Sequence, residues 1–271
     1  MDRQLTLMAV HAHPDDEVLS TGGVLAAASA EGIRTVLVTC TNGEQGDGPG
    51  GIKPGEPGHD EAQVREVRLA ELKASAALLG ITDTELLGYH DSGMVGWEAN
   101  GRPDAFANVP LEQSAARLAA LMETYRPDVV VTYDENGGYG HPDHIQAHRI
   151  TVEAIRTSGI PAKFYHAAIS RSRFTTFFAD LRAQGADVGD FEPPADFGTP
   201  DELITTEVDV SAQVTRKRKA LEAHASQGEN IFFLRLPEEG QQRVFGYESF
   251  VRQFSTVPVP DHEDDLFAGL R

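Results

Sequence analysis

The sequence predicts an α/β fold in which a mostly parallel sheet is covered by helices on both faces. Short apolar runs alternate with helical patterns through the first half of the chain. The apolar runs are continuous rather than alternating, which is typical of strands buried on both faces of a parallel sheet. The 271 residues fit one large domain, and we identify no linker and no internal repeat. We therefore expect a single domain over residues 1–271, with an α/β core over 1–160 and irregular C-terminal strands and helices over 161–271 that complete the site.

Six strands and six helices are predicted from these patterns. The helix over 61–79 has apolar residues at 69, 72, 76 and 79 and stops at Gly80, whereas the helix over 111–125 stops before Pro127. The predicted strands cover residues 5–10, 35–41, 84–87, 128–133, 163–169 and 203–210. The predicted helices cover residues 18–30, 61–79, 111–125, 145–155, 171–182 and 216–224.

Three irregular segments lie between these elements. Residues 46–58 hold six glycines and three prolines, so they form neither helix nor strand. They follow a strand, and they form either a rim over a site or a surface insertion. Residues 46–51 match a dinucleotide-binding pattern literally, but no helix opens at its last glycine, so we reject that match. Residues 185–210 are acidic and are expected to be an exposed loop leading into a strand, and the basic run 216–219 is expected to be a solvated face.

Charge and cysteine content exclude several classes of protein. The formal net charge is −19, so nucleic acid and anionic membranes are excluded as partners. Cys40 is the only cysteine and lies in an apolar run, which excludes an intramolecular disulfide and disfavours thiol chemistry. No apolar run is long enough for a signal sequence or a membrane span. We expect a cytoplasmic protein.

Two clusters of histidine and aspartate follow predicted strands. The first is the run from His11 to Glu17, and the second is the run from Tyr139 to His144. Ligands bind at the carboxyl ends of strands in parallel sheets, so the fold is expected to bring the clusters together. Imidazole and carboxylate are ligands of Zn²⁺, and adjacent carboxylates are costly to bury without a cation. Each cluster alone also fits the start of a helix, with capping or dipole interactions, but this does not explain why both stand at strand ends.

The two clusters resemble the motifs of the LmbE/PIG-L family of metal-dependent N-deacetylases. The family's first motif stands at residues 12–17 as Ala-His-Pro-Asp-Asp-Glu, and its second at 141–144 as His-Pro-Asp-His. Further shared stretches at 91–93, 132–134, 136–144, 223–227 and 265–270 are closest to the mycothiol branch. That branch contains the N-acetylglucosaminyl-inositol deacetylase and the mycothiol S-conjugate amidase.

The resemblance implies a Rossmann-like sheet, one catalytic zinc per chain, with ferrous iron as the alternative metal, and a small amino-sugar substrate. It makes His13, Asp16 and His144 the metal ligands and Asp15 the general base. It implies that His141 stabilises the oxyanion as an imidazolium. The remaining implied roles belong to Asp143, which would orient His141, to Tyr139, which would contact the oxyanion, and to Arg68 and Asp91, which would bind sugar or inositol hydroxyls.

Two positions bear on the choice of substrate within the branch. Ser20 stands where a lysine is expected in the amidase, and Met94 is typical of the deacetylase, so both favour removal of an N-acetyl group. Residues 134–136 and the C-terminal third, with Phe232 and Phe233, are more similar to the amidase. The alternatives are therefore the amidase, a deacetylase of another N-acyl amino sugar, and, in another class, a metal-binding protein without catalysis. A nucleotide-binding oxidoreductase would need a phosphate loop, which this chain lacks.

Overall fold

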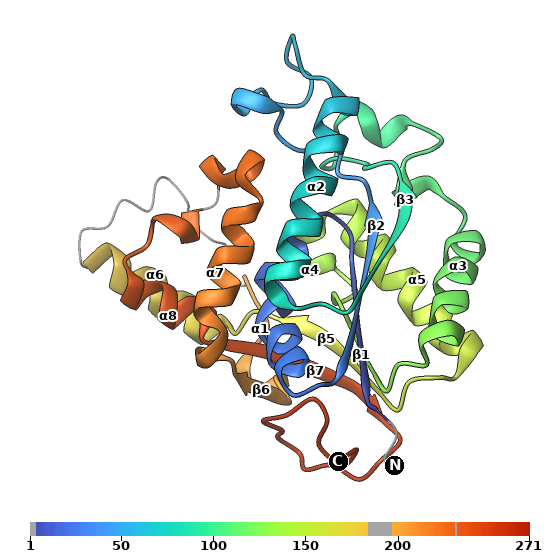
Figure 1. Cartoon of the computed structure of the whole chain (residues 1–271), viewed down its shortest axis with the longest axis vertical. Helices are drawn as coiled ribbons and strands as arrows, with labels where there is room; N and C mark the ends of the chain where they lie inside the picture. Colours follow the sequence, from blue (N-terminus) through green and yellow to red (C-terminus); the bar gives the residue numbers. More distant parts are fainter. Residues whose placement is uncertain (1–3, 184–196, 231) are drawn as a thin grey trace.

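A seven-stranded sheet forms the centre of the computed structural model, which describes residues 4–183, 197–230 and 232–271. The strand order is β3-β2-β1-β4-β5-β7-β6 (Figure 1). The first five strands in this order are parallel to one another, and β7 is antiparallel to both β5 and β6. The predicted α/β fold with a mostly parallel sheet is confirmed, and the order 3-2-1-4-5 is that of a Rossmann-type sheet. The strands are β1 (Thr6–His11), β2 (Arg34–Thr41), β3 (Asp83–Tyr89), β4 (Val129–Thr132), β5 (Lys163–Ala168), β6 (Thr206–Asp209) and β7 (Tyr247–Ser255).

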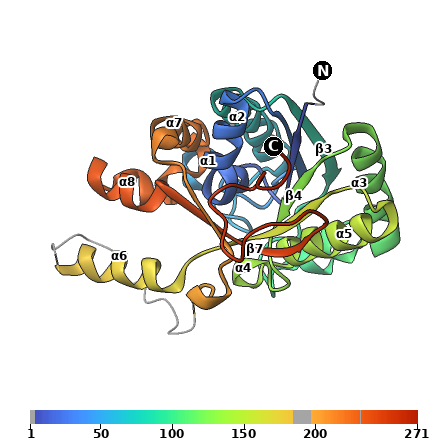
Figure 2. The ribbon, with the colours of Figure 1, turned by 90° about the horizontal axis from the view of Figure 1, so that it is seen from below.

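Helices cover both faces of this sheet, as predicted. Figure 2 shows α1, α2 and α7 grouped on one side, α3 and α5 on the other, and α6 extending away from the sheet. None of the helices within the described ranges is long and apolar enough to cross a membrane. The helices are α1 (Asp16–Ala30), α2 (Glu61–Leu79), α3 (Leu111–Tyr125), α4 (Gly137–Gly140), α5 (Pro142–Ser158), α6 (Arg171–Ala183), α7 (Val214–Ala223) and α8 (Glu238–Phe245).

Alternate residues of β1 supply the two halves of the core. Met8 packs in one cluster with Leu118 of α3 and Ile150 of α5. Leu7 packs in the other with Leu25 of α1 and residues of α2. Successive side chains of a strand point to opposite faces, so a continuous apolar strand is needed to fill both layers.

Two C-terminal elements were not predicted, and one expectation was wrong. The strand β7 lies between β5 and β6, and α8 immediately precedes it. The basic run at 216–219 is not wholly a solvated face, because Lys217 is buried and its Nζ lies 2.6 Å from Oε1 of Glu248. Residues 185–196 of the predicted acidic loop over 185–210 lie outside the described residues, and β6 forms within the remainder.

The glycine-rich segment at 46–58 packs against the C-terminal portion of the chain. The main-chain N–H of Asp47 donates to Oε1 of Gln227 at 3.0 Å, and Nε2 of Gln227 donates to the carbonyl of Asp47 at 3.0 Å. Its one regular piece is the 3₁₀ turn Pro49–Gly51. The helix α2 begins only at Glu61, so the segment lacks the helix start that a dinucleotide loop needs.

Candidate active site

The two histidine and aspartate clusters meet at the carboxyl ends of β1 and β4. These strands are hydrogen-bonded neighbours in the sheet; α1 follows β1, and the short helix α4 and then α5 follow β4. Asp16 stands in the first turn of α1, where the helix dipole favours a carboxylate. Pro142 opens α5, and its ring suits the first helical position. The sequence prediction that these segments lie together therefore holds in the geometry of the fold.

Three potential ligand atoms converge at this point. Nδ1 of His13 lies 3.2 Å from Oδ2 of Asp16 and 3.2 Å from Nε2 of His144, and the last two atoms are 3.4 Å apart. Zinc binds nitrogen and oxygen ligands at about 2.0–2.2 Å, so tetrahedral ligand atoms stand about 3.3–3.5 Å from one another. The observed separations therefore fit a single ion with three protein ligands.

His13, Asp16 and His144 are called the trio below. The hydrogen bonds around the trio leave its ligand atoms with free lone pairs. Nδ1 of His144 lies 3.1 Å from the carbonyl of Gly137, and Nε2 of His13 lies 3.2 Å from a carboxylate oxygen of Asp143. Both partners are acceptors, so each imidazole carries its proton on the nitrogen that faces away from the trio. Two imidazole lone pairs and a carboxylate then face one another in a buried site, an arrangement that a divalent cation stabilises.

Two other groups overlap the same position. Ligand atoms of His13, His141 and His144 lie within 4.8 Å of one another, and so do those of His13, Asp91 and Asp143. Asp91 and Asp143, however, contact the Nε2 side of His13. The His13–Asp16–His144 trio is preferred as the metal site because the distances between its three ligand atoms match one coordination sphere. In addition, the imidazole N–H groups of His13 and His144 point away from the position of the ion.

Asp143 serves His13 rather than His141, which corrects the expectation from the sequence. Its carboxylate is fully buried, accepts the Ser92 N–H at 2.8 Å and the Ser92 hydroxyl, and faces His13. A carboxylate on the far nitrogen of a ligating histidine fixes the tautomer and the orientation of the ring. The contact from Asp143 to His141 comes from its main-chain N–H, which donates to Nδ1 of His141 at 3.1 Å.

The surroundings of His141 favour the neutral ring, whereas the resemblance implied an imidazolium. Burial lowers the pKa of His141 to about 3, and the neighbouring rings of His13 and His144 act in the same direction. Because Nδ1 accepts the Asp143 N–H, the single proton of the neutral ring stands on Nε2. His141 can therefore still donate a hydrogen bond, but it donates as an imidazole.

Asp15 precedes α1 in a conformation that is rare for a residue with a side chain. Its φ is 112° and its ψ is −29°. Its carboxylate accepts from Nη2 of Arg68 at 2.9 Å. Burial raises the pKa of Asp15 in spite of the opposing charge of Arg68. A carboxyl group with a raised pKa is better matched to accepting a proton near neutral pH.

Arg68 and Asp91 are both buried within the protein. Arg68 is 4% exposed, and its guanidinium donates to the carbonyls of Pro14 at 2.6 Å and Gly43 at 3.0 Å, as well as to Asp15. Asp91 is 3% exposed and accepts the N–H of Gly93 at 2.8 Å. Both side chains make hydrogen bonds to the chain itself and hold the loops around the trio in place.

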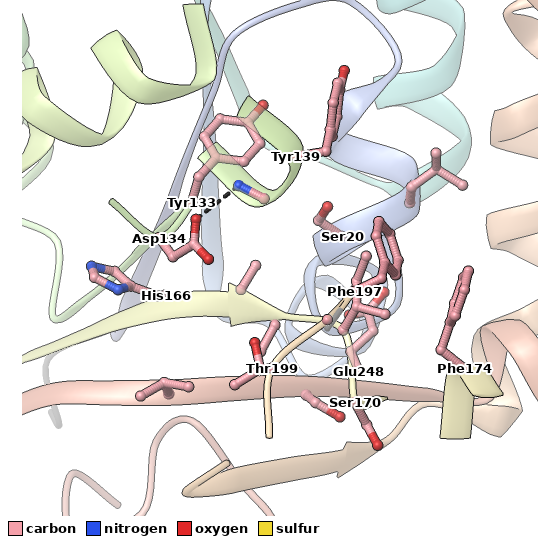
Figure 3. A pocket seen from close by; sticks show the side chains of 18 of the residues that line it. Ser20, Tyr133, Asp134, Tyr139, His166, Ser170, Phe174, Phe197, Thr199 and Glu248 are labelled. Atoms are coloured by element: carbon pink, nitrogen blue, oxygen red, sulfur yellow. Dashed lines mark hydrogen bonds between the residues drawn. The ribbon is translucent and has the colours of Figure 1, made fainter. Parts of the chain in front are cut away.

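A cavity of about 1000 Å³ opens beside the trio (Figure 3). Asp16, His144, Tyr139 and Ser20 line it, whereas Asp15, Arg68, Asp91 and Met94 do not. Most of its remaining lining comes from residues beyond 160. Figure 3 shows Phe174 and Phe197 together at one side and His166 at the other. The phenylalanine and tyrosine residues beyond residue 160 that line the cavity are Phe174, Phe177, Phe197, Phe233, Phe245 and Tyr247.

Tyr139 stands at the mouth of this cavity. It is 56% exposed and lies between two glycines with positive φ, Gly138 and Gly140. Its ring centroid is 5.0 Å from that of His144. Partial burial and the nearby charge of Asp16 raise the pKa of Tyr139, so the phenol keeps its proton and can donate it in a hydrogen bond.

Sequence reasoning missed several residues that shape the site. The Tyr133 hydroxyl donates to Oδ2 of Asp16 at 2.8 Å, and its ring stacks on His144 at 4.2 Å. Glu17, in the first turn of α1, contacts Nε2 of His224 at 2.9 Å. The resemblance marked the stretches around Tyr133 and His224, but no local spacing shows which atoms they reach. His11 is fully buried beneath the site, 2.8 Å from the hydroxyl of Thr21.

Comparisons with known proteins agree with this geometry. Residues 8–155 match the PIG-L family, described as GlcNAc-PI de-N-acetylase. The chain is 46% identical to a 1D-myo-inositol 2-acetamido-2-deoxy-alpha-D-glucopyranoside deacetylase of Acidothermus cellulolyticus, covering 98% of this chain and 95% of that protein. A protein of Thermobifida fusca with the same name is 42% identical, covering 83% of this chain and 84% of that one. Among solved structures, the N,N'-diacetylchitobiose deacetylase from Pyrococcus horikoshii has a TM-score of 0.58 at 19% identity, covers 92% of this chain and 83% of its own, and supports the fold alone.

Proposed function

Because the chain belongs to the PIG-L family, and is therefore a hydrolytic N-deacetylase, we propose that it removes the N-acetyl group of an N-acetylglucosaminyl-inositol with the help of one zinc ion. The observation that carries this proposal is the trio of ligand atoms with separations of 3.2, 3.2 and 3.4 Å beside Asp15. The names of the curated relatives support the substrate. Ferrous iron is the alternative metal that the same ligand types accept.

His13, Asp16 and His144 would hold the zinc ion. Zinc with three protein ligands polarises an amide carbonyl and lowers the pKa of water from 15.7 to about 7. Asp143 and Tyr133 would keep the ligands oriented, the first through His13 and the second through Asp16.

The remaining residues of the site would have separate roles in the hydrolysis. Asp15 would take the proton of the attacking water, and the raised pKa of its carboxyl group supports that role. His141 would donate its Nε2 proton in a hydrogen bond to the oxyanion, and the Tyr139 hydroxyl would donate a second. In known enzymes, one such donor contributes about 3–4 kcal/mol to the stabilisation of a transition state. The C-terminal portion over 161–271 would complete the site by forming most of the cavity.

A second candidate, amide hydrolysis of a mycothiol S-conjugate, is favoured by the cavity itself. An acetyl group would occupy a small part of 1000 Å³, and the far end of the cavity is aromatic. An amide substrate with a larger apolar substituent would bury that surface, at about 25 cal/mol per Å² of apolar area. Phe174 and Phe197 lie there with their ring centroids 4.6 Å apart and would form part of its wall.

One assay separates the two candidates. Zinc-quantified protein is offered N-acetylglucosaminyl-inositol, free N-acetylglucosamine and a mycothiol S-conjugate, and the free primary amine is measured. Turnover of the first substrate alone supports the deacetylase. Turnover of the conjugate with a higher kcat/KM than the first substrate makes the amidase the better assignment. Absence of turnover with about one zinc per chain would refute both substrate proposals.

A further inference from the structure

Asp15 is held in a backbone conformation that favours glycine. Among the described residues, only Asp15 and Arg126 combine a side chain with a positive φ. Arg126, with φ 48° and ψ 55°, lies in the ordinary left-handed helical region, where helix ends are common. Asp15, with φ 112°, lies outside that region, so the surrounding structure must impose its conformation.

Glu17 supplies one of the contacts that impose this conformation. Its Oε2 accepts the main-chain N–H of Asp15 at 2.9 Å, from only two residues along the chain. Arg68 holds the other side, because one nitrogen of its guanidinium donates to the Pro14 carbonyl and to the Asp15 carboxylate. The backbone of Asp15 thus depends on Glu17, and its carboxylate depends on Arg68.

Glu17 is in turn fixed by residues from two other helices. Its side chain is fully buried, and Oε1 accepts the hydroxyl of Ser75 in α2 at 2.5 Å. Nε2 of His224, at the end of α7, lies 2.9 Å from the same oxygen, although the two residues are 207 positions apart. Burial opposes the charge on each partner, yet the pKa of Glu17 is lowered and that of His224 is raised by their mutual attraction.

Stability alone does not account well for this pair. A buried ion pair contributes little net stability, because desolvation of both charges offsets their attraction. His224 also keeps Nδ1 buried without a hydrogen-bond partner among the described residues, which is a further cost. The hydrogen bond from the N–H of Asp15 to Glu17 connects this ion pair to the candidate active site.

We propose that Glu17 and His224 are positioning residues that hold the backbone of Asp15, so that its carboxylate is presented to the reacting water. This inference rests on the proposed role of Asp15 as general base. His224 acts through Glu17, and Glu17 acts through the Asp15 N–H. The C-terminal portion would thereby control the base as well as the shape of the cavity.

Three variants test the positioning role on the full-length, zinc-loaded protein. In E17A and H224A, kcat is expected to fall by about 10- to 100-fold, the effect typical of residues that orient a catalytic group. KM and the zinc content per chain are expected to stay unchanged, because the trio keeps its ligands. E17Q retains a carbonyl oxygen that can accept the Asp15 N–H, so its kcat should lie between those of the wild type and E17A.

The matched control is K163M. Lys163 and Glu263 form another fully buried ion pair, at the start of β5 and therefore at the opposite end of the sheet from the site. Loss of that pair should lower Tm without changing kcat. A fall in kcat that merely followed Tm across E17A, H224A and K163M would overturn the positioning role.

A double-mutant cycle with D15N distinguishes failure of this inference from failure of the proposed function. In the D15N background, H224A should cause no further loss of the residual kcat, because the group that it positions is gone. An equal loss of kcat in both backgrounds would overturn the inference. If D15N is itself as active as the wild type, the general-base assignment fails and the positioning role fails with it. If D15N is inactive and both E17A and H224A turn over at the wild-type rate, only the positioning role fails.

Discussion

The substitution D143N tests whether Asp143 acts through His13. The Asp143 carboxylate has three donors: the N–H of Ser92 at 2.8 Å, the Ser92 hydroxyl, and Nε2 of His13 at 3.2 Å. An asparagine can place its one acceptor oxygen where Oδ2 stands and donate from its NH₂ group to the Ser92 hydroxyl, but it carries no negative charge. We expect the hydrogen bond from Nε2 of His13 to lose its charge assistance, which weakens the control of the ring orientation and of the tautomer that a metal ligand needs.

The expected magnitude follows from the kind of contact that is lost. Mutation of the group that orients a ligating histidine typically lowers metal affinity by about 10- to 100-fold. That range corresponds to about 1.4–2.8 kcal/mol of binding free energy. The loss of a buried, charge-assisted hydrogen bond should lower the free energy of unfolding by about 1.5–3 kcal/mol.

The assay is a zinc titration against a competing chelator, followed by kcat at saturating zinc. D143N should bind zinc more weakly and should recover most of its turnover when zinc is saturating. D128N is a suitable control, because Asp128 is also a buried carboxylate but accepts the Thr6 N–H at the other end of the sheet. Wild-type zinc affinity in D143N, together with a low kcat at saturating zinc, would refute this reasoning and indicate an action on His141.

Three further results are expected. Y139F should lower kcat by about 100-fold with little change in KM, since it removes one oxyanion donor, and steady-state kinetics measures both. Removal of the metal with a chelator should abolish turnover and lower Tm, and added zinc should restore both; retention of activity by metal-free protein would contradict the metal site. Burial raises the pKa of Glu263, but Lys163 and Arg252 outweigh it and hold the pKa below its ordinary 4.5. The stability that Glu263 contributes is then complete above about pH 4.5 and is lost as the pH falls further, so the Tm difference between wild type and E263Q should shrink only on that acid side.

The positions of the two motifs could be predicted because each follows a buried strand directly. Val10 and Val131 belong to continuous apolar runs, and such runs identify parallel strands from the sequence alone. The carboxyl ends of neighbouring parallel strands share one edge of the sheet, which places His13 and His144 together without further information. The family resemblance to PIG-L, carried by the same motifs, was confirmed by the match over residues 8–155.

The finer contacts could not be predicted because they depend on side-chain direction. The resemblance implied that Asp143 orients His141, but the carboxylate of Asp143 faces His13, a residue 130 positions away. The charge state of His141 depends on burial, which the sequence does not give. Lys217 was expected in solvent because its neighbours are basic, yet its ammonium group contacts the carboxylate of Glu248 in β7. The strand β7 was itself not predicted, because it mixes polar and apolar residues.

The most direct test of the account is the release of acetate from N-acetylglucosaminyl-inositol by zinc-quantified wild-type protein and by D15N. The account predicts about one zinc per chain in both proteins, rapid deacetylation by the wild type, and a loss of at least 100-fold in kcat for D15N. Undiminished deacetylation by D15N, or deacetylation that does not depend on zinc, would contradict the proposed mechanism.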